Sequence, residues 1–108
     1  MINQIEPRAL AARLASGPAL RLLDVREPEE NALVALPGAR LVPLGDLAHR
    51  VDELEDWRDE DVVVYCHHGI RSQHAIARLQ AAGFTRLLNL RGGIDAWSLE
   101  VDPRLPRY

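Results

Sequence analysis

Cys66 is the chain's single cysteine, and the residues behind it could support chemistry at sulfur. The loop reads Cys66-His67-His68-Gly69-Ile70-Arg71, six residues from the thiol to the guanidinium, and Ser72 follows. A tight loop between a strand and a helix can turn backbone N–H groups toward one centre, and the helix N-terminus adds partial positive charge there. Gly69 frees the backbone for such a turn, and Arg71 adds a permanent cation. We therefore predict a stabilised, nucleophilic thiolate that can also carry a second sulfur atom as a persulfide.

Cys66 could instead be an inert residue of the core or a metal ligand. A lone cysteine in a cytosolic protein commonly fills space in the core. A filler needs neither the loop nor the arginine, so the pattern favours a reactive sulfur. The three adjacent residues Cys66-His67-His68 cannot easily converge on one ion, and no fourth ligand stands at the usual spacing. We therefore predict no metal site.

The polar residues of the loop leave more than one role open. His67 or His68 could act as a general base, but we expect them to line the loop and tune its polarity. Arg71 could also be a surface cation or a phosphate clamp. Ser72 is expected to cap the following helix rather than to act as a nucleophile.

Asp24 and Arg26 come at the end of an earlier apolar run. They are predicted either to form a structural ion pair beside the site or to act in it directly, and the sequence does not separate the two. His49 and His74 are expected at the surface, whereas the tryptophans Trp57 and Trp97 are expected in the core or at its edge.

Strand-like and helix-like segments alternate along the chain. Strands are predicted at 20–25, 39–44, 62–65 and 87–90, and helices at 7–17, from Asp46 to about 54, at 72–82 and at 94–99, with one helical turn from Pro28 in the irregular segment 26–38. In the first helix we expect Leu10 and Leu14 to lie on one face. We expect Pro7 to begin this helix and Gly17-Pro18 to end it. This alternation predicts an α/β fold, an open parallel sheet with helices on both faces.

The run Val62-Val63-Val64-Tyr65 is predicted to be the central strand, because an uninterrupted β-branched run suits a parallel strand buried on both faces. Cys66 follows it immediately. In such folds reactive groups collect beyond the carboxyl ends of the strands, which is where this cysteine falls.

Composition limits the classes of protein to consider. The 108 residues suit one domain, residues 1–108, with a proline-rich extended tail at 101–108. A formal net charge of −3 without a basic stripe argues against nucleic-acid binding. No apolar run approaches the roughly 20 residues of a membrane span. One cysteine makes no internal disulfide and the start resembles no signal peptide, so we expect a cytoplasmic protein.

Four segments of the chain resemble, in order, the signature segments of a single-domain rhodanese. They are Leu22-Leu23-Asp24-Val25-Arg26-Glu27-Pro28-Glu29-Glu30, Pro37-Gly38-Ala39, Val64-Tyr65-Cys66-His67-His68-Gly69-Ile70-Arg71-Ser72 and Leu90-Arg91-Gly92-Gly93-Ile94-Asp95-Ala96-Trp97. The resemblance implies a five-stranded parallel sheet and a sulfurtransferase. Cys66 would carry a persulfide from a donor such as thiosulfate or another persulfide to a thiophilic acceptor such as cyanide, a thiol or an acceptor protein, with no cofactor besides that persulfide.

The resemblance also bears on the alternatives. Rhodanese-like phosphatases and arsenate reductases have a seven-residue loop, so the six-residue loop here favours sulfur over phosphate. A non-catalytic binding module of the same fold remains the main alternative, and a small phosphatase the weaker one. His67 stands where thiosulfate-preferring members carry a basic residue, and Leu33-Val34-Ala35-Leu36 replaces the usual Gly-His-Ile before Pro37. The end of the chain, from Ile94 to Tyr108, resembles the ends of rhodanese domains fused to enzymes that activate sulfur-carrier proteins, which suggests a sulfur-relay partner.

Overall fold

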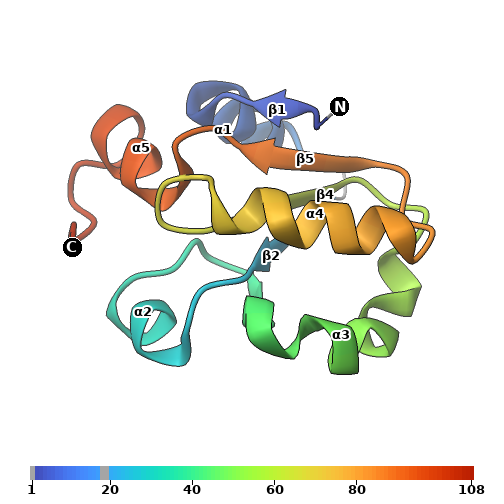
Figure 1. The fold of residues 1–108 in the computed structure, drawn as a ribbon. Coiled ribbons are helices and arrows are strands. Elements are labelled where there is room, and N and C mark those ends of the chain that lie inside the picture. The colour runs from blue at the N-terminus through green and yellow to red at the C-terminus, as the bar shows by residue number, and fades with distance from the viewer. Residues whose placement is uncertain (1, 18–19) are drawn as a thin grey trace.

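Five parallel strands form the centre of the computed structural model, which describes residues 2–17 and 20–108 (Figure 1). Their order across the sheet is β1-β5-β4-β2-β3, and every neighbouring pair is parallel. The strands are β1 (Gln4–Ile5), β2 (Arg21–Asp24), β3 (Arg40–Leu41), β4 (Val62–Tyr65) and β5 (Leu87–Leu90). The predicted α/β class with a five-stranded parallel sheet is confirmed.

Helices cover both faces of the sheet, as predicted. The α-helices are α1 (Pro7–Ser16), α2 (Pro28–Leu33), α3 (Leu47–Arg50), α4 (Arg71–Ala81) and α5 (Gly93–Glu100), and the 3-10 helices are η1 (Leu44–Asp46) and η2 (Val51–Trp57). Buried side chains from α3, η2 and α4 pack on one face, and those from α1 and α5 pack on the other. Figure 1 shows α4 crossing in front of the sheet and α5 beyond its carboxyl edge, at the left.

The central position of β4 is confirmed. It pairs with β2 on one side and with β5 on the other, and all four of its residues are buried. Val62 and Val64 belong to the core beneath α3 and α4, whereas Val63 and Tyr65 belong to the core beneath α1 and α5. Alternate residues of one strand thus enter two cores, which explains the uninterrupted apolar run.

Several predicted boundaries are wrong. The strand expected at 39–44 shortens to Arg40–Leu41, because Pro43 has no N–H for the ladder and a 3-10 helix starts at Leu44. The helix expected from Asp46 is regular only to Arg50 and continues as 3-10, and Asp46 makes no side-chain cap bond with any described residue.

The first helix ends as predicted but faces the core with one leucine only. Gly17 has a φ of 89° and terminates α1 in the left-handed conformation. Leu10 and Leu14 lie one turn apart on α1, but Leu10 is fully buried whereas Leu14 is 39% exposed, so the core covers only part of their shared face. Pro18, expected to belong to the same stop signal, lies outside the described residues.

The tail after α5 turns back toward the sheet. Residues 101–108 include no helix or strand, and the N–H groups of Val101 and Asp102 both bond the carbonyl of Trp97. Leu105 packs against the core beneath α1 and α5. The tail therefore ends beside the carboxyl edge of the sheet, near the loop that follows β4. Among the residues the structure describes, no helix has the length and apolar character needed to cross a membrane.

Candidate active site

Cys66 directly follows β4, and its side chain is 1% exposed. Its Sγ accepts hydrogen bonds from the backbone N–H groups of Gly69, at 3.1 Å, and Ser72, at 3.4 Å. Ser72 lies in the first turn of the 11-residue helix α4, so the sulfur also sits at that helix's positive end. These donors stabilise negative charge on the sulfur, in line with the nest of N–H groups predicted from the sequence.

The loop is pinned from the side of β5. Gly69 has a φ of 99°, and a side chain there would stand 3.3 Å from the backbone nitrogen of Gly92. The Gly69 carbonyl accepts hydrogen bonds from Gln73 Nε2, at 2.8 Å, and Asn89 Nδ2, at 3.3 Å. Glycine is therefore required here both for its backbone conformation and for the close approach of a neighbouring turn.

The loop is pinned from α5 as well. The N–H of Ile94 bonds the carbonyl of Cys66, at 2.9 Å, and that of Asp95 bonds the carbonyl of His67, at 3.1 Å. A side chain on Gly93 would collide with both carbonyls. The Gly92-Gly93 turn thus lets a second helix N-terminus press against the backbone that carries the sulfur, which keeps the loop rigid.

Ser72 has a different role from the predicted one. Ile70, not Ser72, occupies the N-cap position of α4, and Ser72 is the helix's second residue. Its buried hydroxyl donates a short hydrogen bond to Asn89 Oδ1 and lies 3.5 Å from the sulfur of Cys66. Asn89 Nδ2 in turn donates to Gln4 Oε1, at 2.9 Å. A hydrogen-bond chain from the first strand therefore fixes the Ser72 hydroxyl beside the sulfur.

Asn89 and Gln4 were not identified from the sequence. The available signal was Asn89 itself, a polar residue inside the apolar strand Leu87–Leu90, because a buried amide needs hydrogen-bond partners.

Arg71 points to α2 and not to the sulfur. Its two terminal nitrogens donate to both carboxylate oxygens of Glu30, at 2.7 and 2.8 Å. The hydrogen bonds from Arg71 lower the pKa of Glu30 to about 2, against the opposing effect of burial. The same bonds raise the pKa of Arg71, and a charge on Cys66 raises it further. The cation expected at the centre of the loop is thus already paired, which the sequence did not reveal.

The predicted ion pair of Asp24 and Arg26 is present and fully buried, with both side chains 0% exposed. Arg26 donates to Asp24 Oδ1 from Nε, at 2.9 Å, and to Oδ2 from Nη2, at 2.7 Å. Tyr65 and Asn31 also donate to Asp24 Oδ2. Burial alone would lower the pKa of Arg26, but the bonds to Asp24 and to Tyr108 outweigh it and raise the pKa. A direct role in chemistry stays a prediction.

Tyr108 joins the two ion pairs. Its hydroxyl accepts a hydrogen bond from Arg26 Nη1, at 2.8 Å, and donates one to Glu30 Oε2, at 2.7 Å. Its ring stacks on that of His67, with centroids 3.9 Å apart and an interplanar angle of 9°. The side chain is 82 residues from Arg26 along the chain, and sequence reasoning did not place it at the site.

The two loop histidines line the site from the side of the tail. His67 stacks between His68 and Tyr108, and within the described residues its buried Nε2 has no hydrogen-bond partner. Burial, together with His68, lowers the pKa of His67, which disfavours a positive charge on its ring. This agrees with the prediction that it lines the loop. His68 is exposed, as are Ile70 and the remaining histidines, His49 and His74.

Asp95 lies beside the histidines. Its carboxylate accepts from Arg107, at 2.9 Å, and lies 3.7 Å from His68 Nε2. His67, His68 and Asp95 each place one possible metal-ligand atom within 4.8 Å of the other two. The spacing of these residues along the sequence did not suggest this group. Asp95 already has Arg107 as its partner, and the absence of a metal in the mechanism stays a prediction.

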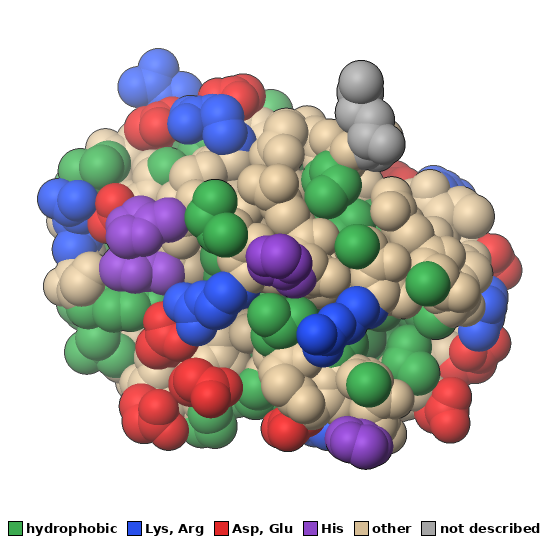
Figure 2. Space-filling view, viewed as in Figure 1, with side chains coloured by type: hydrophobic (Ala, Val, Ile, Leu, Met, Phe, Trp, Pro, Cys, Tyr) green, Lys and Arg blue, Asp and Glu red, His purple; other side chains and the backbone are tan. Residues whose placement is uncertain are grey.

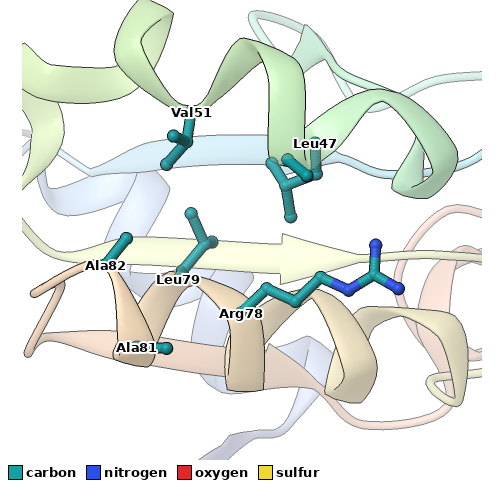
Figure 3. A pocket seen from close by; sticks show the side chains of 7 residues that line it. Leu47, Val51, Arg78, Leu79, Ala81 and Ala82 are labelled. Atoms are coloured by element: carbon teal, nitrogen blue, oxygen red, sulfur yellow. The ribbon is translucent and has the colours of Figure 1, made fainter.

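A hollow of about 360 Å³ opens beside the loop, lined by Val25, Glu27, Leu44, Gly45, Arg71 and Arg78. A second, apolar hollow of about 330 Å³ lies between α3 and α4 (Figure 3). Figure 3 shows Leu47 and Val51 facing Leu79 across it, with Arg78 at one end. Cys66 is not among the described residues that line either hollow, but Arg71 of its loop lines the first, so the hollow beside Arg71 is the better candidate for a substrate.

Comparison with known proteins agrees with this geometry. A family profile described as Rhodanese-like domain matches residues 6–100. The chain is 42% identical over 98 residues to a protein of Allochromatium vinosum named Sulfurtransferase, a match that covers 91% of this chain and 90% of that one. It is 38% identical over 106 residues to a probable adenylyltransferase/sulfurtransferase of Mycobacterium tuberculosis, of which the match covers 27%.

Among solved structures, a rhodanese-related protein from Thermoplasma volcanium matches with a TM-score of 0.81 and 30% identity, over 92% of this chain and 93% of that one. The resemblance noted in the sequence is thereby confirmed, and the chain belongs to the family of rhodanese-like domains.

Proposed function

We propose that the protein is a sulfurtransferase that works through a persulfide on Cys66. The observation that carries the proposal is the position of the sulfur, which accepts two backbone N–H hydrogen bonds at a helix N-terminus. The same donors would stabilise the terminal sulfur of a persulfide. Relatives of this chain are named sulfurtransferases, which supports sulfur transfer in general.

The reaction is a double displacement. The Cys66 thiolate attacks the outer sulfur of the donor, and the bond between that sulfur and the rest of the donor breaks. With thiosulfate, the electron pair of that bond leaves with sulfite, and Cys66 keeps the sulfur as a persulfide. An acceptor such as cyanide, a thiol or an acceptor protein then attacks the outer sulfur, and the Cys66 thiolate leaves. Neither step requires a cofactor other than the persulfide.

The identity of the donor and acceptor is open to experiment. One relative is named adenylyltransferase/sulfurtransferase and another sulfur carrier protein, which supports a sulfur-relay protein as a partner. We propose the cytoplasm as the location, since the mechanism needs a reduced cysteine.

Persulfide loading tests the proposal. The reduced protein is incubated with thiosulfate, with mercaptopyruvate or with a cysteine-desulfurase persulfide, and its intact mass is measured. We expect a gain of one sulfur atom that cyanide or a thiol removes. Cys66→Ser, which leaves the chain without a thiol, should show no gain and only background transfer. No gain with any donor would reject the proposal and favour the non-catalytic binding module.

A further inference from the structure

The two terminal nitrogens of Arg71 are not available to an anion in this structure, because both donate to Glu30. Both terminal nitrogens of Arg71 bond both carboxylate oxygens of Glu30. Glu30 is itself fixed, because its carboxylate accepts a hydrogen bond from the hydroxyl of Tyr108. It also accepts one from the backbone N–H of Glu27, in the capping box of α2. The neutralising carboxylate is therefore held in place by the tail and by its own helix.

The hollow beside the loop is electrically balanced. Its lining includes two cations, Arg71 and Arg78, and one carboxylate, Glu27. Adding Glu30, which pairs with Arg71, brings the formal charges to two positive and two negative, a sum of zero. On the face shown in Figure 2, arginine side chains cross the middle and acidic side chains gather below them, over α2 and α3. No strongly positive field therefore draws a multiply charged anion to this hollow.

His67, the residue after the cysteine, does not replace the positive charge of Arg71 that Glu30 neutralises. His67 is flanked by the rings of His68 and Tyr108, and its Nε2 is buried. A neutral ring attracts an anion far less than a cation does. The positive groups that remain near Cys66 are then the backbone N–H donors and the N-terminus of α4, which suit a single sulfur atom.

We infer that Glu30 is a specificity-determining residue: by neutralising Arg71 it favours sulfur donors of low negative charge, such as the persulfide of a thiol, over small dianions such as thiosulfate. Tyr108 is a positioning residue for Glu30. The inference rests on the proposed sulfurtransferase function and names the class of donor that the site selects.

Glu30→Gln tests the inference, with Glu29→Gln as the matched control. Glutamine keeps the length of the side chain and suits the third position of a capping box, so α2 should stay folded. Glu29 is exposed on the same helix, and its replacement by glutamine removes an equal charge. Two donors that differ in charge are compared: thiosulfate, a dianion, and methanethiosulfonate, a monoanion that also transfers its outer sulfur.

The quantity measured is the second-order rate constant for persulfide formation, from intact mass at short times. The ratio of the rate constants for the dianion and the monoanion cancels any change in the thiol itself. Since Coulomb energy scales with the donor's charge, the extra charge of thiosulfate should raise this ratio by roughly fivefold in Glu30→Gln. In Glu29→Gln the ratio should change by less than about twofold, and high salt should reduce both effects.

The outcomes separate the inference from the proposed function. If wild type and Glu30→Gln both form the persulfide and the ratio is unchanged, the inference is wrong and the proposed function stands. If neither protein forms a persulfide with either donor, the proposed function fails and the inference fails with it. A ratio that rises equally in Glu29→Gln would also overturn the inference, because the effect would then be one of overall charge.

Discussion

Two arginine–carboxylate pairs meet at the hydroxyl of Tyr108, and they differ mainly in burial. Asp24 and Arg26 are both 0% exposed, at the end of β2. Glu30 is 19% exposed and Arg71 is 37% exposed, at the junction of α2 and the loop. Each pair has two hydrogen bonds, from Nε and Nη2 in Arg26 and from the two terminal nitrogens in Arg71, so the number of bonds does not distinguish them.

Burial gives the two pairs different consequences. The Asp24–Arg26 pair is enclosed by Tyr65, Asn31 and the carbonyl of Val34, so losing one partner would leave a charge in surroundings that cannot solvate it. Water reaches the Glu30–Arg71 pair, which limits its contribution to stability. We therefore expect the first pair to act mainly on stability, and we propose the second as the pair that sets specificity.

The largest expected effect is that of Arg26→Met. It leaves Asp24 buried without its cation, and we expect the free energy of unfolding to fall by about 3–5 kcal/mol. Urea unfolding followed by circular dichroism measures it. Arg71→Met is the matched comparison, and its cost should be below about 1 kcal/mol because solvent screens the pair. Equal costs for the two variants would contradict the distinction drawn from burial.

Tyr108→Phe tests the link between the pairs, with a smaller effect. The change removes the hydroxyl that bonds both Arg26 and Glu30 but keeps the ring that stacks on His67. We expect a loss of about 1 kcal/mol in the free energy of unfolding.

A double-mutant cycle with Glu30→Gln shows whether the Tyr108 hydroxyl acts through Glu30. We expect a coupling energy of about 0.5–1 kcal/mol between the two changes. Fully additive effects would mean that the tail does not hold Glu30. Arg107→Gln, which breaks only the tail's contact with Asp95, should show no coupling with Glu30→Gln beyond about 0.3 kcal/mol.

The parts of the fold and site that the sequence predicted depend on local pattern. The composition of Val62–Tyr65 alone predicts a buried strand. The turn after it needs Gly69 because the backbone there has a positive φ, which is a local requirement. The position of Cys66 at the end of that strand follows directly. The hydrogen bonds to its sulfur come from residues three and six positions away, which is why the site could be located.

The parts that were missed depend on contacts between distant residues. Glu30 and Arg71 are 41 residues apart, and Tyr108 is 78 residues from Glu30. A local pattern in the sequence cannot predict such pairs, because they form only when α2 and the tail reach the same edge of the sheet. The strand β1 has two residues and no periodicity, so only its pairing with β5 reveals it. The cap predicted for Ser72 is wrong because the partner of its hydroxyl, Asn89, lies on β5, 17 residues farther along the chain.

The smallest expected effect is a pH dependence that belongs to the exposed pair. The pKa of Glu30 is lowered to about 2 from an ordinary 4.5 by the hydrogen bonds from Arg71. The folded protein therefore holds the proton on Glu30 less tightly than the unfolded chain does. The resulting stabilisation is complete above about pH 4.5 and is lost as the pH falls through about 2. Because solvent screens the pair, we expect at most about 0.5 kcal/mol.

Urea unfolding of wild type and Glu30→Gln across this range measures that contribution. The difference in the free energy of unfolding between the two proteins should be constant near neutral pH and should shrink toward zero in acid. Glu53→Gln, which removes a more exposed carboxylate paired with Arg50, is the control and should show a smaller change with pH. A difference that does not vary with pH would mean that Glu30 does not pair with Arg71 in solution. Arg71 would then be free to bind an anion, which would also contradict the role inferred for Glu30.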